Sequence, residues 1–472
     1  MDNSLHWLSP IQHTASPTLD IRLESAIPFF NGPEHDKLMG LKDEIDRIQT
    51  VQTWDTAKKL TNPYEYIFLS LQKRTHRSIA ACIPLSRSYF KMVEIWRLLG
   101  LKPSEPFLTS HSAEGPGGFL EAIIDCIRPV KSKMIAMTLK STEKTIPGWR
   151  KSQQFLNANP NVLVTYGADG TGNLYSLENQ EDYVRTAKAH LGGLADLYTA
   201  DGGFDFSADF NAQENTIQRL LAAEGLCGLL SMKPGGTMIL KIFDTTYAGT
   251  LDLLWLLSGC FEKTALTKPL TSRPANSERY WIGSRLRSDL PLWVIETLKT
   301  LTALDAPSGW SRIFKDLEYP EQWLEETKAF QTLVESQQIK NIQITLNVIR
   351  QPTKAMIHGL LHSNIEDSLT WCQIHNIPIN PQYQGLTVEK IVALNLEEAQ
   401  EPFQASVSRT NLLALSRPSP MPRASSSGPS LPPPTGLAWR TALPASILGR
   451  APSQTALDTP PSQPSEPPQS PP

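Results

Sequence analysis

The chain has 472 residues, 40% hydrophobic and 19% charged, so it is long enough to bury a sizeable core in more than one folded unit. Its net charge of -3 excludes an overall basic nucleic-acid-binding protein and leaves only local basic patches for that role. Five scattered cysteines and nine dispersed histidines predict neither a disulfide framework nor a metal site. Because the N-terminus is polar and no apolar run is long enough for a membrane, we expect a soluble intracellular protein, nuclear or cytoplasmic.

Residues 1–80 are predicted to form a helical N-terminal extension, because apolar residues recur at helical spacing between Pro33 and Gln52. A basic cluster occupies residues 73–77. A second helix is predicted over Ser86–Gly100, with Ser86 as its cap and Gly100 as its end.

A glycine-rich turn, Glu114-Gly-Pro-Gly-Gly-Phe, lies between a predicted buried strand at 106–109 and a predicted helix at 119–127. Its three glycines lack Cβ, so the backbone can approach a ligand closely. Leu120 stands where a dinucleotide-binding fingerprint has its third glycine, which argues against NAD and a dehydrogenase.

Strands and helices alternate after this turn. Strands are predicted at 134–138, 161–166, 193–201, 237–242, 264–267 and 279–283, and helices at 213–232 and 251–257, with a turn at Lys233-Pro-Gly-Gly. This alternation predicts a mainly parallel, doubly wound α/β sheet with ligands at the carboxyl ends of its strands. We assign residues 81–288 to this domain.

The C-terminal part divides in two. Residues 289–400 are predicted to form a helical extension or a small accessory domain. Residues 401–472 are rich in Pro and Ser and are expected to be disordered, because they have too little apolar surface to bury. This tail is either solvated or binds a partner through segments such as Leu431-Pro-Pro-Pro.

Four polar residues lie where sites of parallel sheets are built. Lys241 interrupts an apolar strand and is costly to bury as a charge unless it is paired, whereas Asp201 follows a strand and precedes two glycines. Lys91 lies on the predicted helix, and Glu278 precedes the last strand. Each has a simpler interpretation, as a snorkelling or solvated lysine, a turn residue or a cap. Together they would place two lysines and two carboxylates beside the glycine turn.

Four segments resemble, in this order, the FtsJ-like (RrmJ-type) ribose 2′-O-methyltransferases, most closely the mRNA cap methyltransferases of eukaryotes and large DNA viruses. They are Glu114-Gly-Pro-Gly-Gly-Phe, Thr199-Ala-Asp-Gly-Gly, Ile239-Leu-Lys-Ile-Phe and, most specific, Ser272-Arg-Pro-Ala-Asn-Ser-Glu-Arg-Tyr. The resemblance covers roughly Ser86 to Gly283. It implies a Rossmann-like class I methyltransferase sheet, S-adenosyl-L-methionine as cofactor, and a catalytic tetrad of Lys91, Asp201, Lys241 and Glu278.

The resemblance assigns the role of general base to Lys241. A lysine can accept a proton only if its pKa falls well below its ordinary value of about 10.4, through burial and a neighbouring cation such as Lys91. Glu278 would then orient a lysine, and Asp201 would orient the attacking hydroxyl.

By the same resemblance, the cofactor is expected at the turn, with Asp169 contacting the adenine, unless Asp169 is only a turn residue. The expected contacts are Glu114, Gly115, Pro116, Gly117, Gly118, Phe119, Asp169 and Asp201. Two positions depart from the family. His111 ends the first strand where many relatives have Asp, and Thr138 follows the second strand where an acidic residue usually binds the ribose. Glu114 is a possible substitute.

RNA contact requires local cations, for which the cluster 73–77, Arg87, Arg273 and Arg279 are candidates, with Tyr89, Phe90 or Trp96 stacking a base unless they belong to the core. The leading hypothesis is methylation of capped mRNA 5′ ends. Methylation of rRNA or tRNA is a second hypothesis. A catalytically silent RNA-binding subunit, whose tail recruits a polymerase or capping partner, is a third.

Overall fold

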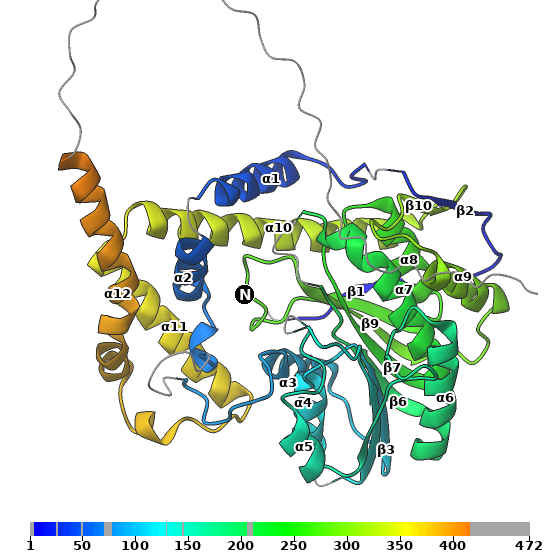
Figure 1. Ribbon diagram of the computed structural model, residues 1–472. Helices are drawn as coiled ribbons and strands as arrows, with labels where there is room; N and C mark the ends of the chain where they lie inside the picture. The colour runs from blue at the N-terminus through cyan, green and yellow to red at the C-terminus, as the bar shows by residue number, and fades with distance from the viewer. Residues whose placement is uncertain are drawn as a thin grey trace, which may run out of the picture. The chain divides into compact units, whose positions relative to one another are not determined.

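The computed structural model describes residues 4–24, 27–48, 51–69, 78–128, 130–143, 146–204 and 211–415. An eight-stranded sheet in the order β1-β8-β9-β7-β6-β3-β4-β5 forms its centre (Figure 1). The strands are β1 His6–Leu8, β3 Phe107–Ser112, β4 Ser132–Met137, β5 Val162–Thr165, β6 Ala195–Ala200, β7 Met232–Ile242, β8 Phe261–Thr267 and β9 Arg279–Leu286. Neighbours from β5 to β7 pair in parallel, whereas β9 is antiparallel to β7 and β8. The expected mainly parallel α/β sheet is confirmed.

Helices cover both faces of the sheet. One buried core joins the sheet to α6 Leu177–Leu191, α7 Gln213–Ser231, α8 Ala248–Ser258 and α9 Leu292–Ala303. The other core joins it to α3 Ser88–Leu99, α4 Gly118–Ile127, α11 Lys354–Ile374 and α12 Val388–Leu415. The remaining helices are α1 Pro33–Asp46, α2 Val51–Thr61, α5 Gln153–Ala158 and α10 Glu321–Arg350, with short 3-10 turns at Glu65–Ile67 and Pro381–Tyr383. No described helix is both long and apolar enough to cross a membrane.

The order of the strands places a ligand-binding crevice beside β3. From β3 the chain builds outward through β4 and β5, and then returns to the other side of β3 with β6. Ligands of open α/β sheets bind at such a switch point, outside the carboxyl ends of the strands. The glycine turn after β3 and the Asp201 loop after β6 therefore meet at this crevice.

The N-terminal extension contains strands as well as helices, which corrects the expectation of a helical extension. β1 pairs with β8 at the edge of the main sheet, and β2 (Leu19–Arg22) pairs with β10 (Arg312–Phe314). With three and four residues, β1 and β2 are too short for a periodic pattern to reveal them. Contacts group Met1–Leu415 into one compact unit, so the predicted segments 1–80, 81–288 and 289–400 pack together.

Three local predictions need correction. Ser86 does not cap α3, because the helix is preceded by Arg87 and has no side-chain cap; Gly100 ends it as expected, in a left-handed conformation. The predicted turn at 233–236 is a bulge within β7, where pairing with β6 passes from Met232 to Thr237. Helix α12 continues past the predicted tail boundary at 401 to Leu415, and residues 416–472 lie outside the described residues.

Candidate active site

Two lysine–carboxylate pairs lie at the carboxyl ends of the central strands. On α3, the Lys91 Nζ is 2.5 Å from the Glu278 Oε1. At the end of β7, the Lys241 Nζ is 3.3 Å from the Asp201 Oδ1 and donates to the Asp201 carbonyl oxygen at 2.8 Å. All four residues line one cavity of about 1270 Å³. The four residues of the predicted tetrad therefore lie together at one site.

Tyr280 links the two pairs, a residue that the sequence interpretation missed. It lies opposite Lys241 in the antiparallel pairing of β7 with β9 and is completely buried. Its hydroxyl is shared between the Asp201 Oδ1 at 3.1 Å and the Glu278 Oε1 at 3.2 Å. Burial, with both carboxylates beside it, raises the pKa of Tyr280 well above its ordinary value, so the hydroxyl remains a donor.

The charges of the site hold one another in place. Burial lowers the pKa of Lys241, but the carboxylates of Asp201, Glu278 and Glu224 outweigh burial and raise it. Burial opposes ionisation of Glu278, yet the ammonium groups of Lys91 and Lys241 keep the pKa of that carboxyl well below its usual range. This differs from the expectation of a lowered lysine pKa: in the protein alone, Lys241 is an ammonium ion.

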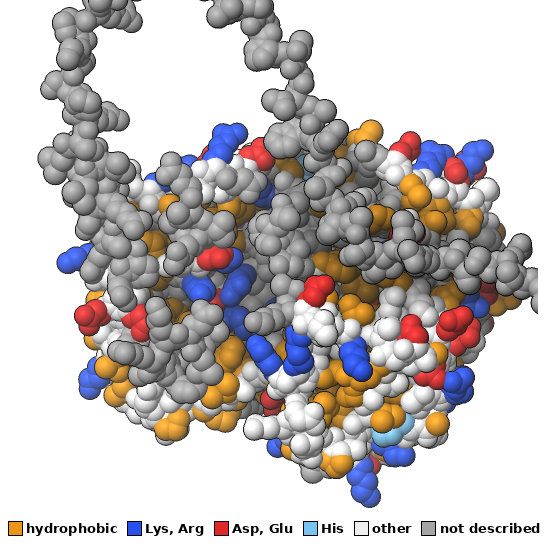
Figure 2. Space-filling model, in the orientation of Figure 1, with side chains coloured by type: hydrophobic (Ala, Val, Ile, Leu, Met, Phe, Trp, Pro, Cys, Tyr) orange, Lys and Arg blue, Asp and Glu red, His pale blue; other side chains and the backbone are white. Residues whose placement is uncertain are grey.

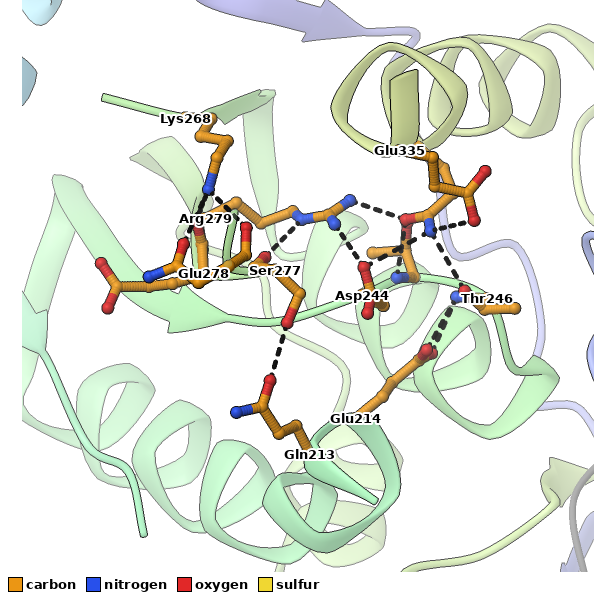
Figure 3. A network of polar contacts seen from close by, with 12 residues as sticks. Gln213, Glu214, Asp244, Thr246, Lys268, Ser277, Glu278, Arg279 and Glu335 are labelled. Atoms are coloured by element: carbon orange, nitrogen blue, oxygen red, sulfur yellow. Dashed lines mark hydrogen bonds and ion pairs between the residues drawn. The ribbon is translucent and has the colours of Figure 1, made fainter. Parts of the chain in front are cut away.

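The loop that carries Glu278 is held by a further lysine, Lys268, just after β8. Its Nζ donates to the carbonyl oxygens of Asn276 at 2.9 Å and Glu278 at 2.8 Å (Figure 3). Burial and the neighbouring Arg279 cation lower the pKa of Lys268 to about 7. Lys268 is thus a positioning residue for Glu278. A lysine directly after an apolar strand was the available signal.

Close packing requires the first of the two glycines after Asp201 and leaves little room at the second. A Cβ on Gly202 would lie 2.0 Å from the Glu224 Oε1, and a Cβ on Gly203 would lie 3.1 Å from the Lys241 Nζ. Glu224 is completely buried in α7, and burial raises the pKa of its carboxyl group well above the ordinary value. The Asp201 loop therefore rests directly on a buried carboxyl group.

The glycine turn contributes less to the cavity than expected. Gly115 and Pro116 line it, whereas a Cβ on Gly117 or Gly118 would meet the chain itself, at 2.9 Å from Trp149 and 2.3 Å from the Ser86 Oγ. Phe119 is completely buried in the core. These last three residues shape the turn without lining the cavity.

Glu114 and Asp169, both expected to contact the cofactor, also lie outside the cavity lining. The buried Glu114 carboxylate accepts a hydrogen bond from Thr199 and lies 3.3 Å from the His111 Nδ1, so it points into the sheet. The exposed Asp169 accepts from the backbone N–H of Thr171 at 2.8 Å within its own turn. The structure does not bring either side chain to the tetrad.

Other residues form the wall of the cavity after β4 and β5. Thr138, Leu139 and Glu143 follow β4, and residues 172–175 follow β5. A Cβ on Gly172 would lie 2.1 Å from the Thr138 carbonyl oxygen, so the two loops touch. Glu143 is an acidic residue of this wall, five positions beyond Thr138, where the resemblance predicts one.

The predicted RNA-contacting residues divide into two groups. Arg87 and Arg273 line the cavity, and the Arg273 guanidinium pairs with Glu65 at 3.0 Å. Arg279 is completely buried and pairs with Asp244 at 2.5 Å (Figure 3), so its assignment to phosphates is wrong. Phe90 is buried in the core, which was the alternative to base stacking for this residue.

The other aromatic candidates, Tyr89 and Trp96, pack within the protein. Tyr89 is buried and donates to Asp125, and the Trp96 ring packs edge-on against Phe107. The cluster 73–77 lies outside the described residues. Figure 2 shows several Lys and Arg side chains gathered near the middle of the face that it presents.

The sheet, with β9 reversed between β7 and β8 and with its site at the β3–β6 crevice, defines a Rossmann-like methyltransferase fold. Residues 84–286 match the model of the FtsJ-like methyltransferase family, so the chain carries an FtsJ-like methyltransferase domain.

The chain is also similar to curated proteins. It is 30% identical over 269 residues to a Dictyostelium discoideum protein named Cap-specific mRNA (nucleoside-2′-O-)-methyltransferase 1. The aligned region covers 52% of this chain and 34% of that protein. A Xenopus laevis protein of the same name is 34% identical over 196 residues, or 40% and 22% of the two chains. The "Probable methyltransferase EP424R" of African swine fever virus (a Kenyan isolate) is 38% identical over 266 residues, or 53% and 61%. The chain thus spans between about a fifth and three fifths of these relatives.

Proposed function

We propose that the protein is an S-adenosylmethionine-dependent ribose 2′-O-methyltransferase that acts on cap-proximal nucleotides of mRNA. The observation that carries the proposal is the pair of lysine–carboxylate contacts, Lys91–Glu278 and Lys241–Asp201, joined by the Tyr280 hydroxyl at one cavity wall. The family match supports methyl transfer, and the names of the relatives support a capped mRNA substrate.

The residues of the cavity fit the proposed cofactor. Backbone lines the cavity at Gly115 and Gly172, where an added Cβ would lie 2.8 Å from the Gly148 Cα and 2.1 Å from the Thr138 carbonyl oxygen, so a nucleoside can approach the main chain there. Asn173 and Glu143, on the same wall, are the side chains suited to hold ribose hydroxyls. When bound, S-adenosylmethionine supplies an electrophilic methyl group and a positive charge at its sulfur.

The protein's own groups then act on the acceptor hydroxyl. Asp201 and Glu278 accept hydrogen bonds and keep Lys241 and Lys91 in fixed positions, so little reorientation is needed during the reaction. Lys241 holds its proton while the three carboxylates alone surround it. Because a nearby cation lowers the pKa of a lysine, a cationic ligand beside Lys241 favours the neutral Nζ, which can accept the hydroxyl proton.

Labelled cofactor and short capped RNA test the proposal, with mass spectrometry locating the methyl group. We expect methylation of a cap-proximal ribose, and a kcat reduced roughly 10²- to 10⁴-fold in both Lys241→Ala and Lys241→Arg, since arginine keeps the charge but cannot act as a base. Methylation unaffected by Lys241→Ala would sink the mechanism. Equal activity on uncapped rRNA or tRNA fragments would refute the substrate, and calorimetry without cofactor binding would refute the activity.

A further inference from the structure

Glu94 is a buried glutamate that lies one turn after Lys91 on α3. Its side chain is completely buried and, unlike that of Lys91, does not line the cavity. Residues three positions apart on a helix lie on the same face, so Glu94 and Lys91 face the same neighbouring segment. That segment is the loop at 268–278 between β8 and β9, which ends with Glu278.

The Glu94 carboxylate accepts two backbone hydrogen bonds from this loop. The Leu270 N–H donates to the Oε2 at 2.7 Å, and the Thr271 N–H donates to the Oε1 at 2.8 Å. Burial raises the pKa of Glu94 to about 6, so at about pH 8 the group is ionised and both oxygens act only as acceptors. The two oxygens therefore fix two consecutive peptide groups of the loop against α3.

Bonds within the loop connect this anchor to Glu278. Ser272, which follows Thr271, donates from its Oγ to the Glu278 carbonyl oxygen at 3.0 Å. Lys268, at the start of the loop, donates to the same oxygen at 2.8 Å (Figure 3). The Glu278 side chain returns to α3, where its Oε1 lies 2.5 Å from the Lys91 Nζ. The loop is thus fastened to α3 at two places, one helical turn apart.

The Lys91–Glu278 contact depends on the backbone at both of its ends. An ion pair between two long side chains must offset the rotamer freedom that both lose, so it holds its geometry only where the two backbones are fixed relative to each other. The helix fixes the backbone of Lys91, and the bonds to Glu94 fix the loop. A shift of about 1 Å in such a contact is enough to cost about 10²-fold in rate.

We propose that Glu94 is a positioning residue of the active site, which holds the loop at 268–278 where Glu278 meets Lys91. Because Glu94 does not line the cavity, it acts through these two residues and not on the substrate. The inference rests on the proposed function, because it presumes that the tetrad carries out methyl transfer.

Glu94→Gln tests the anchor, because an amide of the same size accepts one of the two bonds and turns its own N–H toward the other donor. We expect kcat on the RNA that the wild-type protein methylates to fall about tenfold to a hundredfold. The affinity for S-adenosylmethionine, measured by calorimetry, should change by less than about twofold, because Gly115 and Gly172, beside which the cofactor is proposed to lie, belong to other loops. An unchanged kcat overturns the proposal.

Asp252 provides the matched control for a loss of stability. It is a completely buried carboxylate on α8 that accepts from the Ile313 backbone N–H at 2.7 Å, and it does not line the cavity. Asp252→Asn should lower the melting temperature and leave kcat within about twofold of the wild-type value. Equal losses of kcat in Asp252→Asn and Glu94→Gln would show that the role of Glu94 is structural only.

Two further variants locate the effect at Lys91. Ser272→Ala removes only the next link of the ring, so kcat should fall about twofold to tenfold; an unchanged kcat here overturns the proposal even where Glu94→Gln does not fold. In a Lys91→Met background, Glu94→Gln should lower the single-turnover rate by less than about twofold, because the contact that Glu94 secures is already absent. An undiminished loss in that background contradicts action through Lys91.

The outcomes separate this inference from the proposed function. If the wild-type protein methylates RNA and Glu94→Gln keeps the full kcat, the positioning role alone is overturned. If the wild-type protein neither binds S-adenosylmethionine nor methylates any RNA, the proposed function is refuted, and the role of Glu94 with it.

Discussion

At the scale of single residues, Tyr280 offers the sharpest test of the site. Tyr280→Phe removes only the hydroxyl shared by Asp201 and Glu278 and keeps the ring that packs against Phe119. We expect kcat to fall roughly tenfold to a hundredfold, because two carboxylates lose a common donor, with little change in KM or melting temperature. Steady-state kinetics on capped RNA and thermal unfolding measure these quantities.

A second buried tyrosine serves as the control for this prediction. The Tyr183 hydroxyl accepts from the His111 backbone N–H at 3.0 Å and bonds to Ser110 at 2.8 Å, but it does not line the cavity. Tyr183→Phe should therefore lower the melting temperature and leave kcat nearly unchanged. Equal losses of kcat in the two variants would contradict a specific role for Tyr280.

Lys268 predicts how stability depends on pH. Its pKa is about 7 in the folded protein and about 10.4 in an unfolded chain, so between these values the unfolded chain binds the proton more strongly. The free energy of unfolding should then rise with pH over this window, by up to about 1.4 kcal/mol per pH unit from this group, and the contribution should be constant below pH 7. Urea unfolding at pH 6.5, 7.5 and 8.5 measures the slope.

Lys268→Met isolates this contribution, because methionine keeps the length of the side chain and does not titrate. The variant should lack the part of the slope that Lys268 provides, whatever its stability at neutral pH. Identical slopes in the two proteins would show that Lys268 titrates at its ordinary pKa.

Sequence patterns identified single site residues only where a motif, or a charged residue within an apolar strand, marked them. Lys241 stood out as a lysine in an apolar strand, and the resemblance supplied its three partners. Tyr280 did not stand out, because a tyrosine is ordinary in a strand and its role depends on the antiparallel register with Lys241. Arg279 was misjudged because its partly buried partner Asp244 lies 35 positions earlier, at the end of another strand.

At the scale of elements, a polar network fastens α10 to the strand ends of the site. Arg279 at the start of β9 donates to Gln331 of α10 at 2.6 Å and pairs with Asp244 after β7 (Figure 3). Gln331 also accepts from the Thr245 backbone N–H at 3.0 Å. Since β7 carries Lys241 and Glu278 precedes Arg279, this network sets the position of both against α10.

Removal of the central cation should destabilise the protein strongly. Arg279→Met leaves Asp244 without its main partner, and breaking a buried pair in this way costs about 3–5 kcal/mol. Arg285→Met on the same strand is the control: its side chain is 65% exposed and pairs with Glu262 at 3.4 Å, so the loss should stay below about 1 kcal/mol. Free energies of unfolding in urea decide the matter; similar losses in both variants would contradict the importance of the network.

Local sequence patterns predicted the central strands of the sheet. They did not predict which distant segments pair with one another. Apolar runs and glycine punctuation located β3 to β9 within a few residues. β2 and β10 pair across about 290 positions, and no local pattern encodes such a distant contact. The same holds for α2 and α10, whose shared cavity wall depends on Asn341 and Thr61, 280 positions apart.

At the scale of the whole molecule, the methyltransferase domain shares its core with the segment that follows it. Leu298 of α9, Phe314 of β10 and Trp323 of α10 are buried in the same core as sheet residues of β7 and β9. On the N-terminal side, β1 covers the β8 edge of the sheet. A fragment limited to 81–288 would expose this apolar surface and an unpaired strand edge.

Truncations test whether Met1–Leu415 is the folding unit. A chain ending at Leu415 should unfold cooperatively within a few degrees of the full chain, because the contacts of residues 1–415 form one unit and the removed Pro- and Ser-rich segment has little apolar surface to bury. The fragment 81–288 should aggregate or lose its cooperative transition, because it lacks the large apolar side chains that α9, β10 and α10 contribute to the core. Calorimetry of both chains, with cofactor binding as a second readout, distinguishes these results. A fragment 81–288 that melts cooperatively near the temperature of the full chain would show that the flanking segments are additions to an independent domain and not parts of its core.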